Sequence, residues 1–212
     1  MYQAFGYHFD FIAIPIIKKR LRMDTSQVII NEERPQLTKH LATRAQEKIG
    51  QNVNLLGEVV LGNGEADHRY HHYLEALESP DINYISVKIS GIYAQTHALN
   101  YEESFPELVS RMSALYQKAI DFPYIDETGA KQSKFINLDM EEYKDAHFTL
   151  RLFKTVLSLP QFKNYSAGIV VQAYLPDAHD FQTELLEFAK ARIAEGGAPI
   201  KMRLVKGCNL EM

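Results

Sequence analysis

Five short apolar runs follow one another along the chain after residue 50. They are VNLL at 53–56, YISVKI at 84–89, FINLDM at 135–140, GIVVQAY at 168–174 and MRLVKG at 202–207. Several of these runs are nearly continuous rather than alternating, which is typical of strands that are buried on both faces of a parallel sheet. We therefore predict five parallel strands in this part of the chain.

The segments between these runs carry residues that begin and end helices. The first predicted helix spans 65–78, with Gly62 and Gly64 before it and Pro80 after it, and the second has Pro106 near its start and ends near residue 120. The third spans 141–158 and ends before Pro160, and the fourth runs from the N-cap Asp177 to Gly196-Gly197. One interval is longer because it contains a turn-rich insert, residues 122–133. Strands and helices therefore alternate up to the fifth strand.

This alternation predicts an α/β fold, a partial (β/α)8 TIM-type barrel with its first five strands present. Apart from the interval with the insert, the strand starts lie about 30 residues apart, which is the length of one βα unit. No glycine-rich phosphate-binding turn follows the first strand, which disfavours an open doubly wound sheet. A whole barrel needs about 250 residues. We therefore expect residues 51–212 to be the N-terminal five-eighths of a barrel, and the chain to be truncated.

Residues 1–50 have a different pattern and are predicted to form a helical N-terminal arm. Helices are expected around 9–22 and 35–49, and no run there is typical of a buried strand. The basic cluster Lys18-Lys19-Arg20-Leu21-Arg22 could contact acidic lipid or nucleic acid. Such a cluster is more often a solvated helix face, and we interpret it as one.

The composition is that of a soluble globular protein. Of the 212 residues, 46% are hydrophobic and 24% are charged, and the formal net charge of −4 argues against a nucleic-acid partner. Cys208 is the single cysteine, so no internal disulfide is expected and a reducing compartment is indicated. The apolar stretch from Phe9 to Ile17 is too short and too interrupted for a membrane span or a secretory signal. We predict a cytoplasmic protein.

Polar and charged residues recur at the carboxyl ends of the predicted strands, where the active sites of such barrels lie. They are Glu58, Lys88, Asp139, Gln172, Arg203 and Lys206. Buried charges are costly unless they are paired or used, so packing alone does not explain this set. It indicates a catalytic layer, and the structural alternative is an internal salt-bridge layer of Glu58, Lys88, Asp139 and Arg203.

Five segments of the chain resemble the flavin-dependent proline dehydrogenase domain, which occurs alone and at the front of the bifunctional proline utilisation A enzymes. The segments are NVNLLGE at 52–58, YISVKIS at 84–90, FINLDMEE at 135–142, GIVVQAYLPD at 168–177 and RLVKG at 203–207. They stand in the family's order and spacing and cover roughly residues 50–212. The final KGCNLEM is similar to a branch of the bifunctional enzymes.

The resemblance implies a catalytic site that contains Lys88, Asp139 and Glu58. Lys88 matches the family lysine that meets the proline carboxylate, since a small anionic group needs a fixed cation. Asp139 matches an aspartate beside the flavin and the substrate pocket, where it holds basic groups; its structural alternative is to cap a helix that starts at Met140. Glu58 matches a glutamate that pairs with a basic group and orients it.

The same resemblance implies FAD as the cofactor. Gln172 matches a flavin ligand, and Arg203 matches the arginine beside the reactive flavin nitrogen, where a cation stabilises the negative charge of the reduced ring. Lys206, Gly207 and Cys208 match the strand-end stretch that lies against the flavin, and glycine there permits close backbone approach.

The implied reaction is the oxidation of L-proline to 1-pyrroline-5-carboxylate, with electrons passed from FAD to a quinone. A quinone acceptor would bring the parent enzyme to the surface of the inner membrane as a peripheral protein. The sequence offers no anchor for such contact beyond the basic cluster at residues 18–22.

Two alternatives from other classes remain open. Lys88 or Lys206 could serve as the desolvated amine of a Schiff-base lyase or aldolase on the same barrel. The truncated barrel could instead be non-catalytic and form a homo-oligomer through its exposed sheet edge.

No metal site is expected. His68 and His72 lie four residues apart on one predicted helix face, a spacing that can hold a metal ion. The apolar side of that helix, with Tyr73 and Leu77, leaves these histidines outward, and we interpret them as a solvated patch. Cys208 lacks a base nearby in the sequence, so we do not expect it to act as a nucleophile.

Overall fold

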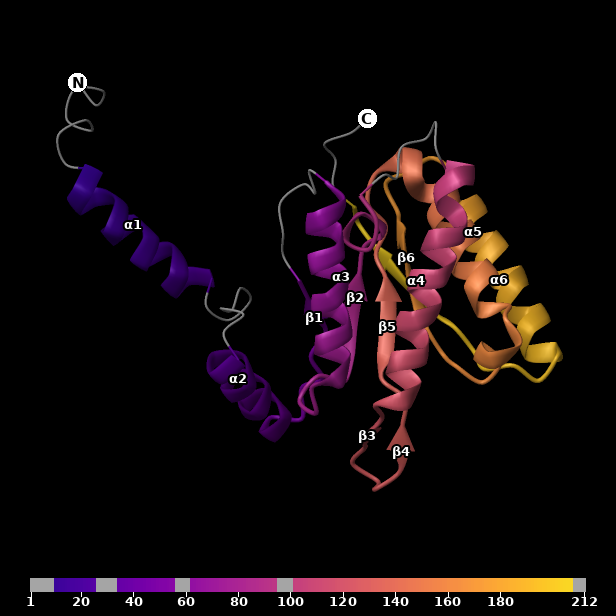
Figure 1. The fold of residues 1–212 in the computed structure, drawn as a ribbon, viewed down its shortest axis with the longest axis horizontal. Coiled ribbons are helices and arrows are strands. Elements are labelled where there is room, and N and C mark those ends of the chain that lie inside the picture. The colour runs from indigo at the N-terminus through magenta and orange to yellow at the C-terminus, as the bar shows by residue number, and fades with distance from the viewer. Residues whose placement is uncertain (1–9, 26–33, 56–61, 95–100, 208–212) are drawn as a thin grey trace. The chain divides into compact units, whose positions relative to one another are not determined.

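The computed structural model describes residues 10–25, 34–55, 62–94 and 101–207 (Figure 1). The chain divides into two compact units between Gly50 and Gln51. Each unit is described separately below.

The first unit contains two helices, α1 (Asp10–Thr25) and α2 (Arg34–Gln46). Helices are thus present in both places where the sequence predicts them. On α1, Arg20 pairs with Asp24 one turn further along the same helix, at 3.1 Å.

The second unit is built around a five-stranded parallel sheet in the order β1-β2-β5-β6-β7. The strands are β1 (Val53–Asn54), β2 (Tyr84–Val87), β5 (Phe135–Leu138), β6 (Gly168–Gln172) and β7 (Lys201–Val205). Neighbours in this sheet also follow one another along the chain, so the sheet advances in one direction as it does in a β/α barrel. The predicted partial barrel is confirmed.

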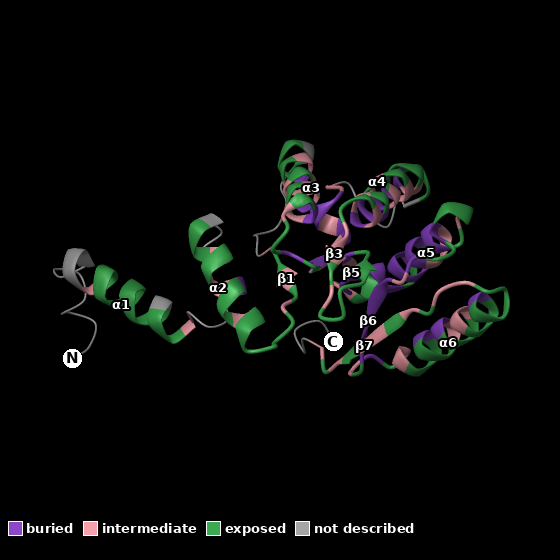
Figure 2. Ribbon diagram, turned by 90° about the horizontal axis from the view of Figure 1, so that it is seen from below, coloured by how far each residue is buried: buried purple, intermediate pink, exposed green. Residues whose placement is uncertain are grey.

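Four helices line one face of the sheet. They are α3 (Asn63–Glu78), α4 (Tyr101–Asp121), α5 (Ala146–Leu157) and α6 (Ala178–Ala194). Figure 2 shows them as an arc outside the strands, with their exposed surfaces outward and their buried surfaces toward the sheet. The described residues also form three single-turn 3-10 helices, η1 (Ile89–Gly91), η3 (Tyr143–Asp145) and η4 (Pro160–Phe162).

The three central strands β2, β5 and β6 are mostly buried on both faces, whereas β1 and β7 are partly exposed, and polar side chains lie on the face away from the helices. Ile85, Val87 and Leu138 are at most 1% exposed and alternate along their strands with Ser86 and Asn137, which are also fully buried. Since successive strand residues point to opposite faces, the inner face of the sheet carries polar side chains. The nearly continuous apolar runs in the sequence did not indicate this row of polar side chains.

The turn-rich insert forms a small antiparallel hairpin that the sequence did not predict. Its strands are β3 (Tyr124–Ile125) and β4 (Lys131–Gln132). Figure 1 shows the hairpin beyond the amino ends of the parallel strands, at the opposite end of the sheet from the strand carboxyl ends. The insert therefore adds no residue to that carboxyl end.

One predicted helix start and one predicted cap contact differ in the structure. The helix expected from residue 141 begins at Ala146, because η3 precedes it and Glu142 keeps an extended backbone. Asp177 stands at the N-cap of α6, as predicted, but its carboxylate accepts a hydrogen bond from the Tyr143 hydroxyl and not from the helix backbone.

Candidate active site

Asp139 lies at the centre of a polar cluster at the carboxyl end of the sheet. It directly follows β5, and its side chain is only 11% exposed. Its Oδ1 accepts hydrogen bonds from Asn137 Nδ2 at 2.8 Å and from Arg203 Nη2 at 2.6 Å, and its Oδ2 accepts one from Asn54 Nδ2 at 3.3 Å. One carboxylate therefore joins β1, β5 and β7.

The environment of Asp139 contains opposing electrostatic effects. Burial raises the pKa of its carboxyl, while Arg203, the hydrogen bonds from Ser86 and Asn137, and the charge of Lys88 act to lower it. Burial prevails, so the partners only partly offset the cost of removing the carboxylate from water. The alternative role as a helix cap is wrong, since α5 begins seven residues later, at Ala146.

Arg203 is the third residue of β7 and pairs in register with Val170 of β6. Its ion pair with Asp139 uses Nη2, and its Nε is buried without a hydrogen-bond partner. The guanidinium thus has a fixed anchor at one end and an unused buried donor at the other.

Gln172 is the last residue of β6 and is buried. Its Nε2 donates hydrogen bonds to the backbone oxygens of Met140 at 3.3 Å and Glu141 at 3.1 Å, and its buried Oε1 has no partner. These bonds orient the amide so that an acceptor is left for another group.

Lys88 directly follows β2 and is half-buried. The register of β2 against β5 pairs Val87 with Leu138, so Lys88 and Asp139 come next at the same level of the sheet. Lys88 is the weakest of the partners that lower the pKa of Asp139. The salt-bridge layer considered above therefore consists, in the described residues, of the Asp139–Arg203 pair with Lys88 beside it.

Lys206 and Gly207 directly follow β7, and Lys206 is exposed. Gly207 has a φ of +95°, which favours glycine, and a Cβ there would lie 1.9 Å from a ring carbon of Tyr174. The close neighbour that this glycine accommodates is therefore Tyr174. Glu58 and Cys208 lie outside the described residues.

Unpartnered buried polar atoms gather at this cluster. Among the described residues, five buried side-chain polar atoms have no hydrogen-bond partner, and three of these are Asn137 Oδ1, Gln172 Oε1 and Arg203 Nε. Buried polar groups are normally satisfied, so such a concentration is typical of a site that binds another molecule.

Sequence reasoning missed the uncharged members of the cluster, which are Asn54, Ser86, Asn137 and Ser90. The hydroxyl of Ser90 donates a hydrogen bond to the carboxylate of Glu141. A signal for two of them was present, since Asn137 and Ser86 stand two residues before Asp139 and Lys88. Because side chains two apart on a strand share a face, they belong to the same inner row.

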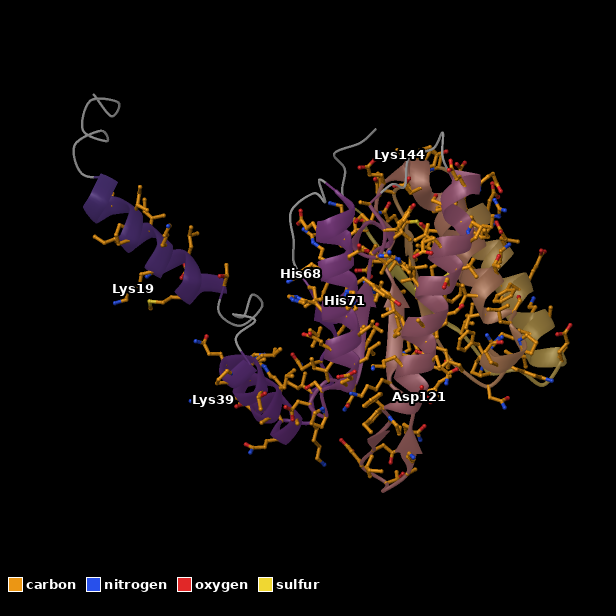
Figure 3. The ribbon with its side chains drawn as sticks, in the orientation of Figure 1. Lys19, Lys39, His68, His71, Asp121 and Lys144 are labelled. Carbon is orange, nitrogen blue, oxygen red and sulfur yellow. The ribbon has the colours of Figure 1, made fainter. Side chains whose placement is uncertain are left out.

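The histidines of α3 lie away from this cluster. His68 and His71 project from the outer side of α3 in Figure 3, and the ring centroids of His68 and His72 are 4.2 Å apart. Within the described ranges, no group of three or more His, Cys, Asp or Glu residues could hold a metal ion. In the same part of the chain, no helix has both the length and the hydropathy that a membrane crossing requires.

The family model for proline dehydrogenase matches residues 37–212. The chain belongs to the proline dehydrogenase family. The match begins within α2, upstream of the segments that carry the resemblance in the sequence. A comparison with curated proteins found no significant match.

Solved structures of proline dehydrogenase proteins share this fold. Proline utilization A from Corynebacterium freiburgense is 42% identical, with a TM-score of 0.80 over 90% of this chain. The enzyme from Bdellovibrio bacteriovorus, inactivated by N-propargylglycine, is 29% identical, with a TM-score of 0.76 over 91% of this chain. This chain spans 19% and 21% of the length of those two proteins, respectively, about a fifth in each case.

Proposed function

We propose that this chain contributes to a proline dehydrogenase active site that binds FAD and oxidises L-proline to 1-pyrroline-5-carboxylate. The observation that carries the proposal is the Asp139–Arg203 pair at the carboxyl end of the sheet, with Lys88 and Gln172 beside it. Family membership supports the reaction class. When bound, FAD supplies the two-electron acceptor for the substrate carbon next to the ring nitrogen.

The cluster has the donor and acceptor set that a flavin ring requires. Gln172 offers a buried acceptor and Arg203 a buried donor, each without a partner among the described residues. In this proposal, Gln172 accepts from an N–H of the ring, and Arg203 places its charge where negative charge accumulates. Lys206, Gly207 and Cys208 complete the flavin-binding stretch.

Lys88, Asp139 and Glu58 are the proposed substrate side of the site. Lys88 binds the proline carboxylate by a charge-assisted hydrogen bond. Asp139 holds Arg203 in position. Burial raises the pKa of Asp139 and Arg203 lowers it, so the charge of Asp139 depends on the position of Arg203. Glu58 orients a basic group.

We further propose that the electrons leave through a quinone. A lipid-soluble acceptor would require a cytoplasmic enzyme to touch the membrane surface peripherally. Reduction of a quinone analogue by the proline-reduced enzyme, with and without vesicles, tests this part of the proposal separately.

Turnover is measured in the whole enzyme, meaning this chain together with whatever sequence its gene encodes beyond it. The flavin-loaded whole enzyme is mixed anaerobically with L-proline, and D-proline serves as the control. We expect L-proline to bleach the flavin absorbance and to yield 1-pyrroline-5-carboxylate. A flavin that L-proline does not bleach would contradict the proposal, as would borohydride trapping of a carbonyl substrate on Lys88 or Lys206, which is the result expected of a Schiff-base lyase.

A further inference from the structure

We infer that Glu141 is a positioning residue that fixes the segment carrying Lys88 and the side-chain amide of Gln172 relative to each other. This inference rests on the proposed function, because it concerns how the substrate side and the flavin side of that site are held together. Glu141 contacts both sides, through its carboxylate on one and its backbone carbonyl on the other.

The carboxylate of Glu141 holds Ser90, two residues after Lys88. Its Oε2 accepts the Ser90 backbone N–H at 3.0 Å, and its Oε1 accepts the Ser90 hydroxyl at 2.7 Å. Ser90 is the middle residue of η1, the single turn that directly follows Lys88. Two hydrogen bonds from one charged group fix both the position and the rotation of this turn.

The backbone carbonyl of Glu141 holds the other side of the site. It accepts a hydrogen bond from Gln172 Nε2 at 3.1 Å, next to a second one accepted by Met140 at 3.3 Å. These bonds decide that the free atom of the Gln172 amide is its acceptor oxygen. A shift of the backbone at Glu141 would therefore move the ends of β2 and β6 together.

A second group holds the same turn from the helix side. Tyr73 on α3 is 2% exposed and makes a hydrogen bond with the backbone of Lys88. Its hydroxyl would lie 2.9 Å from a Cβ at Gly91, so the turn fits against Tyr73 only with glycine there. Tyr73 and Glu141 thus both hold the segment 88–91, Tyr73 at Lys88 and Gly91 and Glu141 at Ser90.

Glu141 can reach Ser90 because the chain after Asp139 does not enter a helix at once. Glu142 is extended, η3 begins at Tyr143, and α5 begins only at Ala146. A helix from residue 141 onward would impose helical spacing on the side chains that follow Asp139. The late helix start is therefore part of the arrangement.

The test uses the whole enzyme with Glu141→Ala, Glu141→Gln and the matched control Glu142→Ala. Glu142 is the neighbouring glutamate, and its carboxylate pairs with Lys144. For Glu141→Ala we expect KM for proline to rise about tenfold or more while kcat changes much less, because the turn with Lys88 is released but the carbonyl that holds Gln172 remains. Flavin content should be unchanged.

The conservative variant separates positioning from a general loss of structure. Glu141→Gln keeps an acceptor for the Ser90 N–H and should restore most of the proline KM. Ser90→Ala removes the hydroxyl bond, so the double variant Glu141→Ala/Ser90→Ala should match Glu141→Ala alone. Equal KM values for Glu141→Ala and wild type, or an equal effect of Glu142→Ala, would overturn the inference.

A readout that does not need turnover distinguishes failure of this inference from failure of the proposed function. Amide hydrogen exchange at Ser90 is measured in this chain. Faster exchange in Glu141→Ala but not in Glu142→Ala supports the link even if L-proline does not bleach the flavin of the whole enzyme. Unchanged exchange at Ser90 overturns the link whatever the activity.

Discussion

At the scale of single residues, the site depends on one buried carboxylate that accepts hydrogen bonds from several side chains. Asp139 is surrounded by Arg203, Asn137 and Asn54, and burial still raises its pKa. Burying an ion pair costs desolvation energy that its attraction often only balances, so a pair like this contributes placement more than stability. In this site it places the guanidinium of Arg203.

Replacing Lys88 by alanine should weaken proline binding in the whole enzyme while leaving the flavin bound. Loss of one charge-assisted hydrogen bond to a carboxylate should cost about 1.5–3 kcal/mol, a rise of about 10- to 150-fold in KM. Steady-state kinetics and flavin absorbance measure the two effects. Lys190→Ala, which removes an exposed lysine from α6, is the matched control. An unchanged KM would remove Lys88 from the substrate site.

Replacing Asp139 by asparagine should change how stability depends on pH. A carboxyl whose pKa is raised by folding loses its stabilising contribution as the pH rises from its ordinary value, 3.8, through its value in the folded protein. The free energy of unfolding of Asp139→Asn should therefore improve relative to wild type as the pH rises through this window.

Urea unfolding of this chain at several pH values measures that difference. Asp121→Asn, at the exposed end of α4 (Figure 3), is the control for loss of one negative charge. The opposite result would be a wild type that becomes more stable relative to Asp139→Asn as the pH rises. It would show that the ion pair with Arg203, and not burial, dominates the pKa of Asp139.

At the scale of elements, loops and turns decide which side chains meet. The delayed start of α5 leaves Glu141 able to reach Ser90, and the insert closes into a hairpin away from the site. In the hairpin, Asp126 Oδ1 accepts hydrogen bonds from the backbone N–H groups of Thr128 at 2.8 Å and Ala130 at 3.0 Å. The turn is thus organised by a single carboxylate.

Acid should loosen this hairpin as the carboxylate of Asp126 gains a proton. Hydrogen bonds from Thr128, Gln132 and Ala130 lower the pKa of Asp126 from 3.8 to about 2. A lowered pKa means that the stabilisation is present above the ordinary value and is lost as the pH falls from 3.8 toward 2. The amide resonances of Thr128 and Ala130 should shift with a midpoint near the lower value. A midpoint close to 3.8 would contradict the hydrogen-bonded turn.

At the scale of the whole molecule, the described sheet is open. Its order runs from β1 to β7, and neither of these two strands has a second neighbour among the described residues. On β7, Leu204 is 58% exposed. Unpaired strand edges and exposed apolar side chains favour pairing with further strands or with another chain.

We expect this chain by itself not to turn over proline. Water that enters an open barrel weakens the electrostatic contacts on which the proposed site depends. Purified chain 1–212 is supplied with FAD, L-proline and a quinone-like dye, and the whole enzyme is assayed in parallel. Dye reduction by the chain at the rate of the whole enzyme would contradict this expectation. Light scattering over a concentration series measures self-association through the open edge.

Some features could be predicted from the sequence because they depend on local patterns. The apolar runs located the five parallel strands, and Gly62, Pro80 and Pro160 marked helix ends close to those observed. The charged residues at the strand ends were recognisable because parallel strands place their carboxyl ends at one edge. The insert was recognised as turn-rich. Its two strands, β3 and β4, have only two residues each and were too short to predict.

The sequence by itself determined the strand order and the end of the sheet at which the polar residues gather. The hydrophobic pattern of each strand and the residues that end each helix are encoded within a few neighbouring positions. Only the tertiary structure decided which of these residues touch. Arg203 reaches Asp139 across 64 residues of chain and Asn54 reaches it across 85, and both contacts depend on sheet register. Register is set by the packing of whole strands and helices, so no local pattern specifies that Glu141 contacts Ser90 while its carbonyl holds Gln172.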